Sequence, residues 1–287
     1  MKNTRIGFIG QGFIGKNYAD DFEDRGYEVI RYSKEKPHDR NKETVGKCDI
    51  VFIAVPTPTT PEGYDVGIIR NVIPLTKAGS IVVIKSTMLP GMTKIIQQEF
   101  PHRIIMHSPE FLSEVTATYD AAHPFMNIIG LTKNNESHQK AAELVHSTFR
   151  PASFSKTVSS EEAELIKYTH NCSGFAQIIF FNLMYDLALK MGADWKNIKE
   201  ALEADPFVST KYASPVHKSG RGAGGHCFIK DMAAFREVYE DKVGDLEGVN
   251  VIASMEEKNK SLLRESKKDL ELMNEVYGED YAEFQRK

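Results

Sequence analysis

The chain has 287 residues, 41% of them hydrophobic and 26% charged, a composition typical of a globular protein with about two domains at roughly 150 residues each. Its formal net charge of -4 and the lack of a basic block argue against nucleic acid as a partner. No apolar run approaches the ~20 residues of a membrane span and the strand-like N-terminus lacks a signal-peptide pattern, so we expect a cytoplasmic protein without a membrane partner.

The N-terminal residues predict a dinucleotide-binding turn. A short buried strand at 5–9 runs into a G-x-G-x-x-G turn, an amphipathic segment at 16–25 and a second strand at 27–32. The glycines of such a turn permit a tight bend and close approach to a pyrophosphate, which the helix N-terminus then faces. The predicted cofactor contacts in this turn are Gly10, Gln11, Gly12, Phe13, Ile14 and Gly15.

The end of the second strand departs from this pattern. An acidic residue is expected there for the ribose hydroxyls, whereas the sequence has Arg31, Ser33 and Lys34, which could instead meet a 2′-phosphate. A carboxylate at the end of the second strand would repel the 2′-phosphate of NADP. Its absence removes this discrimination against NADP more surely than it creates a preference for NADP. We therefore predict NAD as the cofactor, with weak selectivity and with NADP not excluded.

Strands and helices alternate through the first half, which predicts a parallel sheet with helical crossovers. The candidate strands are 6–9, 28–32, 50–54, 81–84, 104–106 and 127–130. Ligand chemistry in such sheets collects at the carboxyl ends of strands, where the loops 55–58, 85–87 and 108–114 follow. Turn chemistry alone explains each loop, but three of them at one sheet edge favour a functional site.

Residues 161–192 predict one long helix that is apolar nearly all round, as expected of a helix buried in a core or at a subunit interface. Lys167 and Asn171 lie four apart on it and share a face; as an isolated pair they would be surface residues. Cys172 in this helix and Cys48 before the third strand are predicted to be structural. With Cys227 they are too few and too scattered for a disulfide framework or a metal site.

Residues 224–231 read Gly-Gly-His-Cys-Phe-Ile-Lys-Asp and place a thiol, an amine and a carboxylate behind a glycine-rich loop. The neighbouring basic side chains favour a nucleophilic thiolate at Cys227. If a helix begins near this cysteine, Asp231 lies one turn along on the same face. The octapeptide alone is equally consistent with a glycine-rich turn that contains an incidental cysteine.

In order and spacing these motifs resemble the UDP-glucose/GDP-mannose dehydrogenase family over about residues 5 to 260. The motifs that carry the resemblance are the glycine turn, Val55-Pro56-Thr57-Pro58, Lys85-Ser86-Thr87, Ser108-Pro109-Glu110-Phe111-Leu112, Glu164-Leu165-Ile166-Lys167-Tyr168 with Asn171, and Gly224 to Asp231. The resemblance implies an α/β fold: an N-terminal Rossmann domain with a doubly wound parallel sheet (1–155), then an all-helical central domain with one long helix (156–260). It further implies a homodimer through that helix, and residues 261–287 are expected to form a charged helical tail.

Members of this family oxidise the primary alcohol of a nucleotide sugar to a carboxylate, with two NAD molecules in succession. The resemblance makes Cys227 the nucleophile that carries the substrate as a thiohemiacetal and then a thioester. The implied catalytic set is Cys227, Lys167, Asn171, Asp231, Thr87, Glu110 and Glu114. In this role Lys167 should matter for turnover and hardly for folding.

The resemblance also implies binding residues. Besides the glycine turn, the implied cofactor contacts are Ser33, Val55, Pro56, Thr57, Thr87 and Lys230. The implied substrate contacts are Phe111, Leu112, Lys167, Asn171, Tyr212, Gly224 and Gly225. No metal ligand is expected.

Two departures from the family pattern leave the substrate open. The family's third domain, which closes over the nucleotide, is not expected because no strand-helix repeat follows Val251, and locally Ile229 stands where the family usually has Pro. Two other functions stay open. A two-electron dehydrogenase of the β-hydroxyacid type has the same two-domain plan but no use for Cys227, and a catalytically idle accessory protein would only bind a dinucleotide.

Overall fold

The structure, a computed structural model, describes residues 4–278 of the chain. Its residues form two compact units. The first unit contains the chain up to Thr57 together with Asp65–Lys167. The second unit contains Pro58–Tyr64 and the residues from Tyr168 onward.

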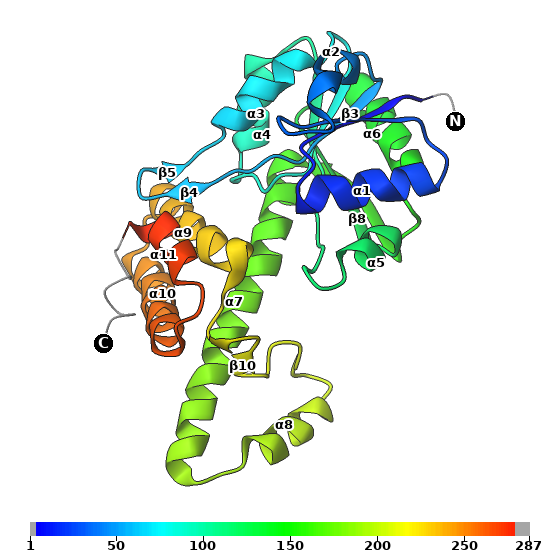
Figure 1. Ribbon diagram of the computed structural model, residues 1–287. Helices are drawn as coiled ribbons and strands as arrows, with labels where there is room; N and C mark the ends of the chain where they lie inside the picture. The colour runs from blue at the N-terminus through cyan, green and yellow to red at the C-terminus, as the bar shows by residue number, and fades with distance from the viewer. Residues whose placement is uncertain (1–3, 279–287) are drawn as a thin grey trace. The chain divides into compact units, whose positions relative to one another are not determined.

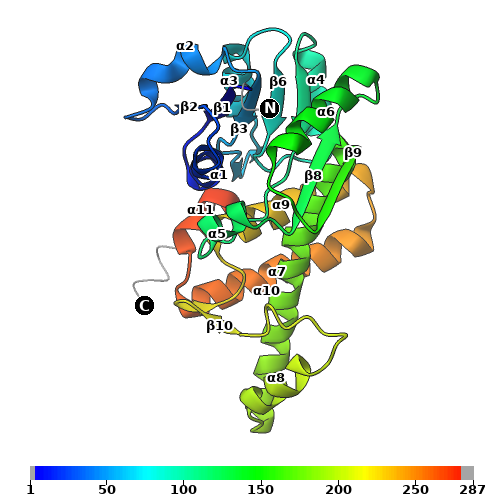
Figure 2. The same ribbon diagram turned by 90° about the vertical axis from the view of Figure 1, so that its right-hand side faces the viewer.

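The first unit is built on a seven-stranded sheet in the order β2-β1-β3-β6-β7-β8-β9 (Figures 1 and 2). The strands are β1 (Ile6–Ile9), β2 (Val29–Tyr32), β3 (Ile50–Ile53), β6 (Ile81–Ile84), β7 (Ile104–His107), β8 (Met126–Leu131) and β9 (Phe154–Ser159). From β2 to β7 all neighbours pair in parallel. This confirms the predicted parallel sheet, and the strand order reverses between β1 and β3, where open sheets of this kind bind ligands.

The central strands β1, β3 and β6 form because their side chains are buried on both faces. Every residue of β1, β3 and β6 is buried, and these strands consist almost entirely of β-branched and aromatic residues. Phe8 of β1 stacks on Phe52 of β3 with 4.9 Å between ring centroids, and Phe22 packs edge-on to Phe8. The helices of the first unit are α1 (Phe13–Asp24), α2 (Lys42–Val45), α3 (Gly67–Val72), α4 (Met92–Glu99), α5 (Ala117–Ala122), α6 (Glu136–Thr148) and the start of α7 (Ser160–Met191).

One edge of the sheet differs from the prediction. Strand β8 runs antiparallel to β7, with Met106 opposite Leu131, and β9 pairs with β8 in parallel (Figure 2). The sequence gives no sign of β9, because Phe154–Ser159 is a mostly polar segment whose side chains are exposed or half-buried at the sheet edge. An edge strand without a buried face lacks the apolar alternation by which strands are recognised.

The second unit is helical. It contains α7 from Tyr168 onward, α8 (Trp195–Glu203), α9 (Gly225–Lys242), α10 (Leu246–Ser266) and α11 (Leu270–Tyr277). The predicted long helix and the predicted helix start near Cys227 are both confirmed. The unit is not purely helical, because two short hairpins belong to it: β4 (Thr59–Thr60) with β5 (Gly63–Tyr64), and β10 (Val216–His217) with β11 (Gly220–Arg221).

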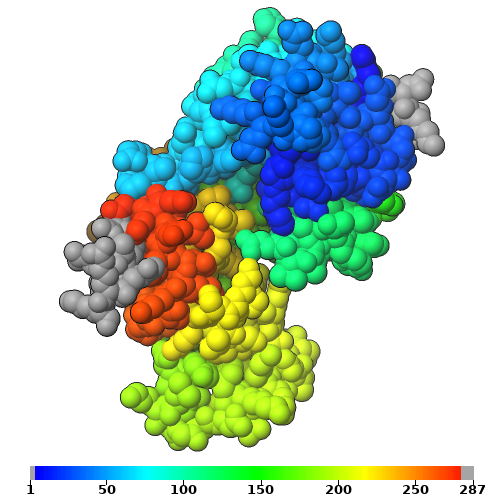
Figure 3. Space-filling view, viewed as in Figure 1, coloured from blue at the N-terminus to red at the C-terminus, as the bar shows by residue number. Residues whose placement is uncertain are grey.

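The C-terminal helices pack against α9. Ile229 and Ala233 of α9 form a buried cluster with Leu263 of α10 and with Leu270 and Met273 of α11, and Figure 3 shows α11, in red, beside the yellow α9. The described part of the predicted charged tail is therefore two helices. Helix α10 ends at Ser266, where the next residue, Lys267, has a left-handed φ of 53°. The remainder of that predicted tail, 279–287, lies outside the described residues.

Helix α7 leaves an apolar stripe uncovered in this chain. Phe180, Leu183, Leu187 and Met191, three or four residues apart, are each 48 to 74% exposed. By length and hydropathy alone, α7 is also the one helix of residues 4–278 that could cross a membrane, with 33% of the relevant stretch buried. Core helices of soluble proteins pass the same test.

Candidate active site

The glycine turn between β1 and α1 has the geometry that a dinucleotide requires. Gly10 has a φ of 94°, and a Cβ there would lie 2.2 Å from the Ala54 carbonyl oxygen. A Cβ on Gly15 would lie 2.0 Å from the Gly10 carbonyl oxygen, whereas around Gly12 there is open space for at least 4 Å. Gly10 and Gly15 are thus needed for the turn itself. Gly12 leaves the N-terminus of α1 open to a pyrophosphate, so the residues present fit the cofactor.

This difference predicts that Gly12→Ala should spare the fold but hinder the cofactor. Because an added methyl group meets nothing in the protein, the melting temperature should not change. The methyl group would occupy the approach to the pyrophosphate, so NAD affinity should fall about tenfold or more, which is about 1.4 kcal/mol. Calorimetric titration with NAD tests this. Gly15→Ala is the control that should lower the melting temperature, and unchanged NAD binding by Gly12→Ala would contradict the assignment.

The positive charge at the end of β2 is already paired. Arg31 forms ion pairs with Asp20 at 2.6 Å and Glu23 at 2.7 Å, both on α1. The Ser33 hydroxyl donates a hydrogen bond to the Glu35 carbonyl oxygen at 2.7 Å. The guanidinium of Arg31 is therefore already neutralised by two carboxylates. This weakens the prediction from sequence that Arg31 could bind the 2′-phosphate of NADP.

The loops after β3 and β6 are tied together at the carboxyl edge of the sheet. The Ser86 hydroxyl accepts from the Val55 N–H at 3.0 Å and donates to the Val55 carbonyl oxygen at 2.7 Å. The Thr57 hydroxyl donates to the Thr87 carbonyl oxygen at 3.0 Å. Two of the three predicted loops are therefore hydrogen-bonded to each other around the buried Thr57, Ser86 and Thr87.

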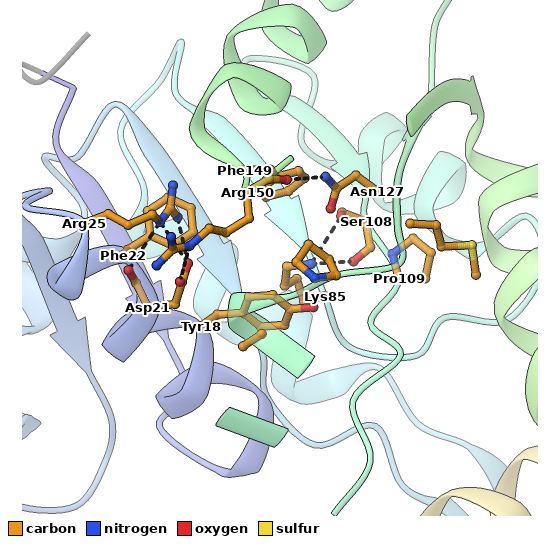
Figure 4. A pocket seen from close by; sticks show the side chains of 13 residues that line it. Tyr18, Asp21, Phe22, Arg25, Lys85, Ser108, Pro109, Asn127, Phe149 and Arg150 are labelled. Carbon is orange, nitrogen blue, oxygen red and sulfur yellow. Dashed lines mark hydrogen bonds and ion pairs between the residues drawn. The ribbon is translucent and has the colours of Figure 1, made fainter. Parts of the chain in front are cut away.

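Lys85 of the Lys-Ser-Thr motif points into the first unit. Its Nζ lies 4.2 Å from the Tyr18 ring centroid and 5.2 Å from that of Phe149, and it donates to the Ser108 carbonyl oxygen at 3.3 Å (Figure 4). The adjoining cavity of about 20 Å³ has room for one water molecule. No carboxylate in residues 4–278 forms an ion pair with this lysine, and burial lowers the pKa of Lys85 to about 7.

The lowered pKa of Lys85 makes stability depend on pH. Between about pH 7 and pH 10 the amine is neutral in the folded protein but protonated in the unfolded chain. The unfolded state then binds more protons, so the free energy of unfolding should rise with pH by up to about 1.4 kcal/mol per unit. Lys85→Met should lose this rise, while the exposed Lys133→Met should keep it. Urea denaturation across this range measures it, and equal slopes for Lys85→Met and the unaltered protein would contradict the burial of the charge.

Glu110 and Lys167 form a buried ion pair within the first unit. Lys167 Nζ lies 2.8 Å from Glu110 Oε1 and 2.6 Å from the Glu110 carbonyl oxygen, and both side chains are 4% exposed. The Leu112 N–H donates to the other carboxylate oxygen at 2.8 Å. Although burial opposes the charged form, the Lys167 ammonium and these hydrogen bonds hold the pKa of Glu110 below its usual range. The buried pair leads us to expect that folding depends on Lys167, whereas the sequence analysis expected this lysine to matter hardly for folding.

Glu164, on α7, is a further buried carboxylate, to which the sequence analysis assigned no role. Glu164 accepts hydrogen bonds from the backbone N–H groups of Gly91 at 2.6 Å and Thr93 at 2.8 Å, and so caps the start of α4. Burial raises the pKa of Glu164 to about 7. The signal was present in the sequence, because Glu164 lies three residues before Lys167 and hence on the same face of the helix.

The second unit brings Asn171 and Asp231 together. Asn171 Nδ2 donates to Asp231 Oδ2 at 2.6 Å, and both side chains are buried. Lys230 Nζ pairs with the other oxygen of the same carboxylate. Cys227 lies four residues before Asp231 on α9, hence on the same helix face, and is exposed.

The remaining predicted residues have diverse surroundings. The Tyr212 ring packs edge-on to Phe228 with 5.8 Å between centroids, and the Phe111 ring lies 5.5 Å from Lys167 Nζ. Glu114 and Gly12 are exposed, whereas Gly224 and Gly225 are half-buried against residues of the C-terminal segment. The assignment of Phe111, Tyr212, Gly224 and Gly225 to the substrate and of Glu114 to catalysis stays a prediction. Among residues 4–278 no cluster of three or more His, Cys, Asp or Glu side chains could hold a metal ion.

Several polar side chains of α7 are buried and several apolar ones are exposed, which is the reverse of what a surface helix shows. Glu164, Lys167 and Asn171 are all at most 6% exposed, whereas Leu165 is 51% and Leu187 is 51% exposed. Buried charged and amide groups are costly unless they are paired. Such a row on one helix face is common where polar side chains serve a reaction.

The comparisons with known proteins agree with this geometry. Residues 31–150 match the NAD binding domain of the UDP-glucose/GDP-mannose dehydrogenase family, and residues 161–261 match the central domain of the same family. The UDP-glucose 6-dehydrogenase YwqF of Bacillus subtilis is 26% identical over 232 residues, which are 76% of this chain and 51% of that protein. The chain thus spans about half the length of the first curated relatives it matches.

Solved structures share the fold. The UDP-glucose dehydrogenase of Pyrobaculum islandicum superposes with a TM-score of 0.78 at 22% identity, covering 96% of this chain and 71% of that one. The 3-hydroxyisobutyrate dehydrogenase of Mycobacterium tuberculosis gives a TM-score of 0.71 at 15% identity, covering 96% and 98%. Two domains of this chain, at residues 31–150 and 161–261, match the NAD binding domain and the central domain of one family. The chain therefore belongs to the UDP-glucose/GDP-mannose dehydrogenase family.

Proposed function

We propose that the chain catalyses the four-electron oxidation of the primary alcohol of a nucleotide sugar, such as UDP-glucose, to the carboxylate through a covalent Cys227 intermediate. The observation that carries the proposal is the buried polar row on α7, in which Lys167 is paired with Glu110 and Asn171 with Asp231. Bound NAD would supply the hydride acceptor for both oxidation steps. The remaining chemistry falls to side chains of this chain.

In the first step the alcohol carbon loses a hydride and its hydroxyl loses a proton, which gives an aldehyde. We assign the proton to a water molecule held by Thr87 and Asp231. The Cys227 sulfur then bonds to the aldehyde carbon and forms a thiohemiacetal, whose oxyanion is stabilised by Lys167 and Asn171. Loss of the second hydride converts the thiohemiacetal to a thioester.

Hydrolysis completes the reaction. Water adds to the thioester carbon, the carbon-sulfur bond breaks, and the carboxylate leaves while the thiol regains its proton. Glu110 is the base that we assign to this water, because Lys167 keeps its carboxylate ionised. Serine in place of Cys227 would give a weaker nucleophile at neutral pH and a less reactive ester.

A panel of nucleotide sugars tested with NAD and with NADP, read as cofactor reduction, tests the proposal. One member should be oxidised with two reduced cofactors formed per sugar, and Cys227→Ala is the control. A panel with no oxidised sugar, or one reduced cofactor per substrate, would contradict it. The cytoplasmic location expected from the sequence stays a prediction.

The alternative is a two-electron dehydrogenase of the β-hydroxyacid type. The nearly complete mutual coverage with the 3-hydroxyisobutyrate dehydrogenase structure, 96% of this chain and 98% of that one, favours it. Such an enzyme would form one reduced cofactor per substrate and would not need Cys227. The stoichiometry therefore separates the two candidates, while a chain that only binds NAD would oxidise neither substrate.

We also propose that the chain forms a homodimer through α7. The exposed stripe of Phe180, Leu183, Leu187 and Met191 is larger and more regular than scattered surface apolar residues. Light scattering should give twice the chain mass of 32.3 kDa. A monomer at all concentrations would contradict the proposal.

A further inference from the structure

The loop that leads into α9, residues 222–224, is hydrogen-bonded to residues 259–269 of the second unit. The Ala223 N–H donates to Asn259 Oδ1 at 2.7 Å, and Asn259 Nδ2 donates back to the Ala223 carbonyl oxygen at 3.0 Å. Lys268 Nζ donates to the Gly222 carbonyl oxygen at 2.9 Å. Asn259 and Lys268 are both buried, so these backbone groups gain partners that water does not replace.

The same segment caps α9 itself. The N–H of Gly225, the first residue of α9, donates to Asp269 Oδ2 at 2.8 Å. Gly224 occupies the N-cap position and has no side chain with which to cap the helix. A Cβ on Gly224 would lie 2.0 Å from Asp269 Oδ2, so the glycine makes room for a cap that comes from elsewhere in the chain.

Asp269 holds an unfavourable backbone conformation to supply this cap. Its φ is 53° and its ψ 34°, in the left-handed region that non-glycine residues rarely adopt, and Lys267 has a φ of 53° as well. The Asp269 carboxylate does not cap its own helix, α11. Strained residues persist where surrounding contacts fix them, and they cluster near functional sites.

We propose that Asp269 is a positioning residue for the Cys227 nucleophile. Cys227 lies in the first turn of α9, two residues after Gly225, so the hydrogen bond to Asp269 fixes the backbone that carries the thiol. Lys268 and Asn259 fix the loop that precedes it. This role rests on the proposed function. It goes beyond the matched family residues, because Asp269 lies after residue 261, where the match to the central domain ends.

Two substitutions of Asp269 distinguish a role in positioning Cys227 from a role in the stability of the fold. Asp269→Gly removes the cap but suits the left-handed backbone, so its melting temperature should stay near that of the unaltered protein. Its turnover should fall about ten- to a hundredfold, because the nucleophile is no longer held in place, while the KM for NAD should not change. Asp269→Asn keeps an oxygen that accepts from Gly225 and tolerates this φ, so it should restore most of the turnover.

A matched control is Asp245→Ala, which removes the side-chain cap of α10, where Asp245 accepts from the Gly248 N–H at 3.0 Å. It should lower the melting temperature and leave turnover unchanged. Turnover near normal in Asp269→Gly, or an equal loss in Asp269→Asn, would overturn the proposal.

Alkylation of Cys227 by iodoacetamide, followed by mass spectrometry, gives a readout that does not depend on the sugar. The rate should change several-fold in Asp269→Gly and hardly in Asp269→Asn or Asp245→Ala. Cys48 and Cys172 serve as internal references. An unchanged rate in Asp269→Gly would overturn the positioning role even if no nucleotide sugar is oxidised, so the two failures are distinguishable.

Discussion

Replacing Cys227 with alanine should lower the rate of acid formation by at least about a thousandfold, while the protein stays folded. The first oxidation needs no covalent bond, so the variant should release at most one reduced cofactor per substrate, together with an aldehyde. Because Cys227 is exposed in the first turn of α9, its loss should leave no cavity in the core. Rapid-mixing measurement of cofactor reduction, with the melting temperature, checks both statements.

Serine at position 227 refines this test. Cys227→Ser should stall at an ester that hydrolyses slowly, which intact-mass spectrometry can detect as a protein adduct. Cys172→Ala is the control, since that thiol on α7 is half-buried and has no assigned role. Two reduced cofactors per substrate at the normal rate from Cys227→Ala would remove the thiol mechanism.

Lys167→Ala should impair both folding and turnover. Removing one partner of a buried ion pair leaves the Glu110 carboxylate without its counter-ion, at a cost of about 3 to 5 kcal/mol in the free energy of unfolding. Turnover should fall roughly a hundred- to a thousandfold, as is typical when one oxyanion donor is lost. Urea denaturation and steady-state kinetics measure the two effects.

A double substitution separates these two effects. In Lys167→Met with Glu110→Gln, neither buried group is charged, so most of the stability should return while turnover stays low. Turnover near normal in Lys167→Ala would show that the lysine is structural. Stability equal to that of the unaltered protein in Lys167→Ala would contradict the buried pair.

The sequence predicted most of the sheet because most of its strands are short apolar runs, buried wholly or in part and bounded by turn residues. It missed Phe154–Ser159, since an exposed edge strand carries no periodic signal. It also predicted a fully parallel sheet, although β8 is antiparallel to β7. Strand direction depends on where the chain returns to the sheet, which a local pattern does not record.

For the candidate site, the sequence identified residue types but not their partners. Lys167 and Asn171 were expected to share a helix face, yet only the structure shows that they are paired with Glu110 and Asp231, from segments at least 57 residues away. Asp269 gave no signal at all. Its function as a cap depends on a contact 44 residues back along the chain, and no helix-capping pattern spans such a distance.

The chain crosses between the two units three times, after Thr57, after Tyr64 and after Lys167. Residues 58–64 belong to the second unit and form the β4–β5 hairpin, which packs on α9 and α11. No contiguous fragment can therefore contain the complete second unit without also containing residues 65–167 of the first. Cutting the gene at residue 168 should yield a C-terminal polypeptide whose helices expose the surface that the hairpin covers, and adding residues 58–64 as a separate peptide should increase its solubility.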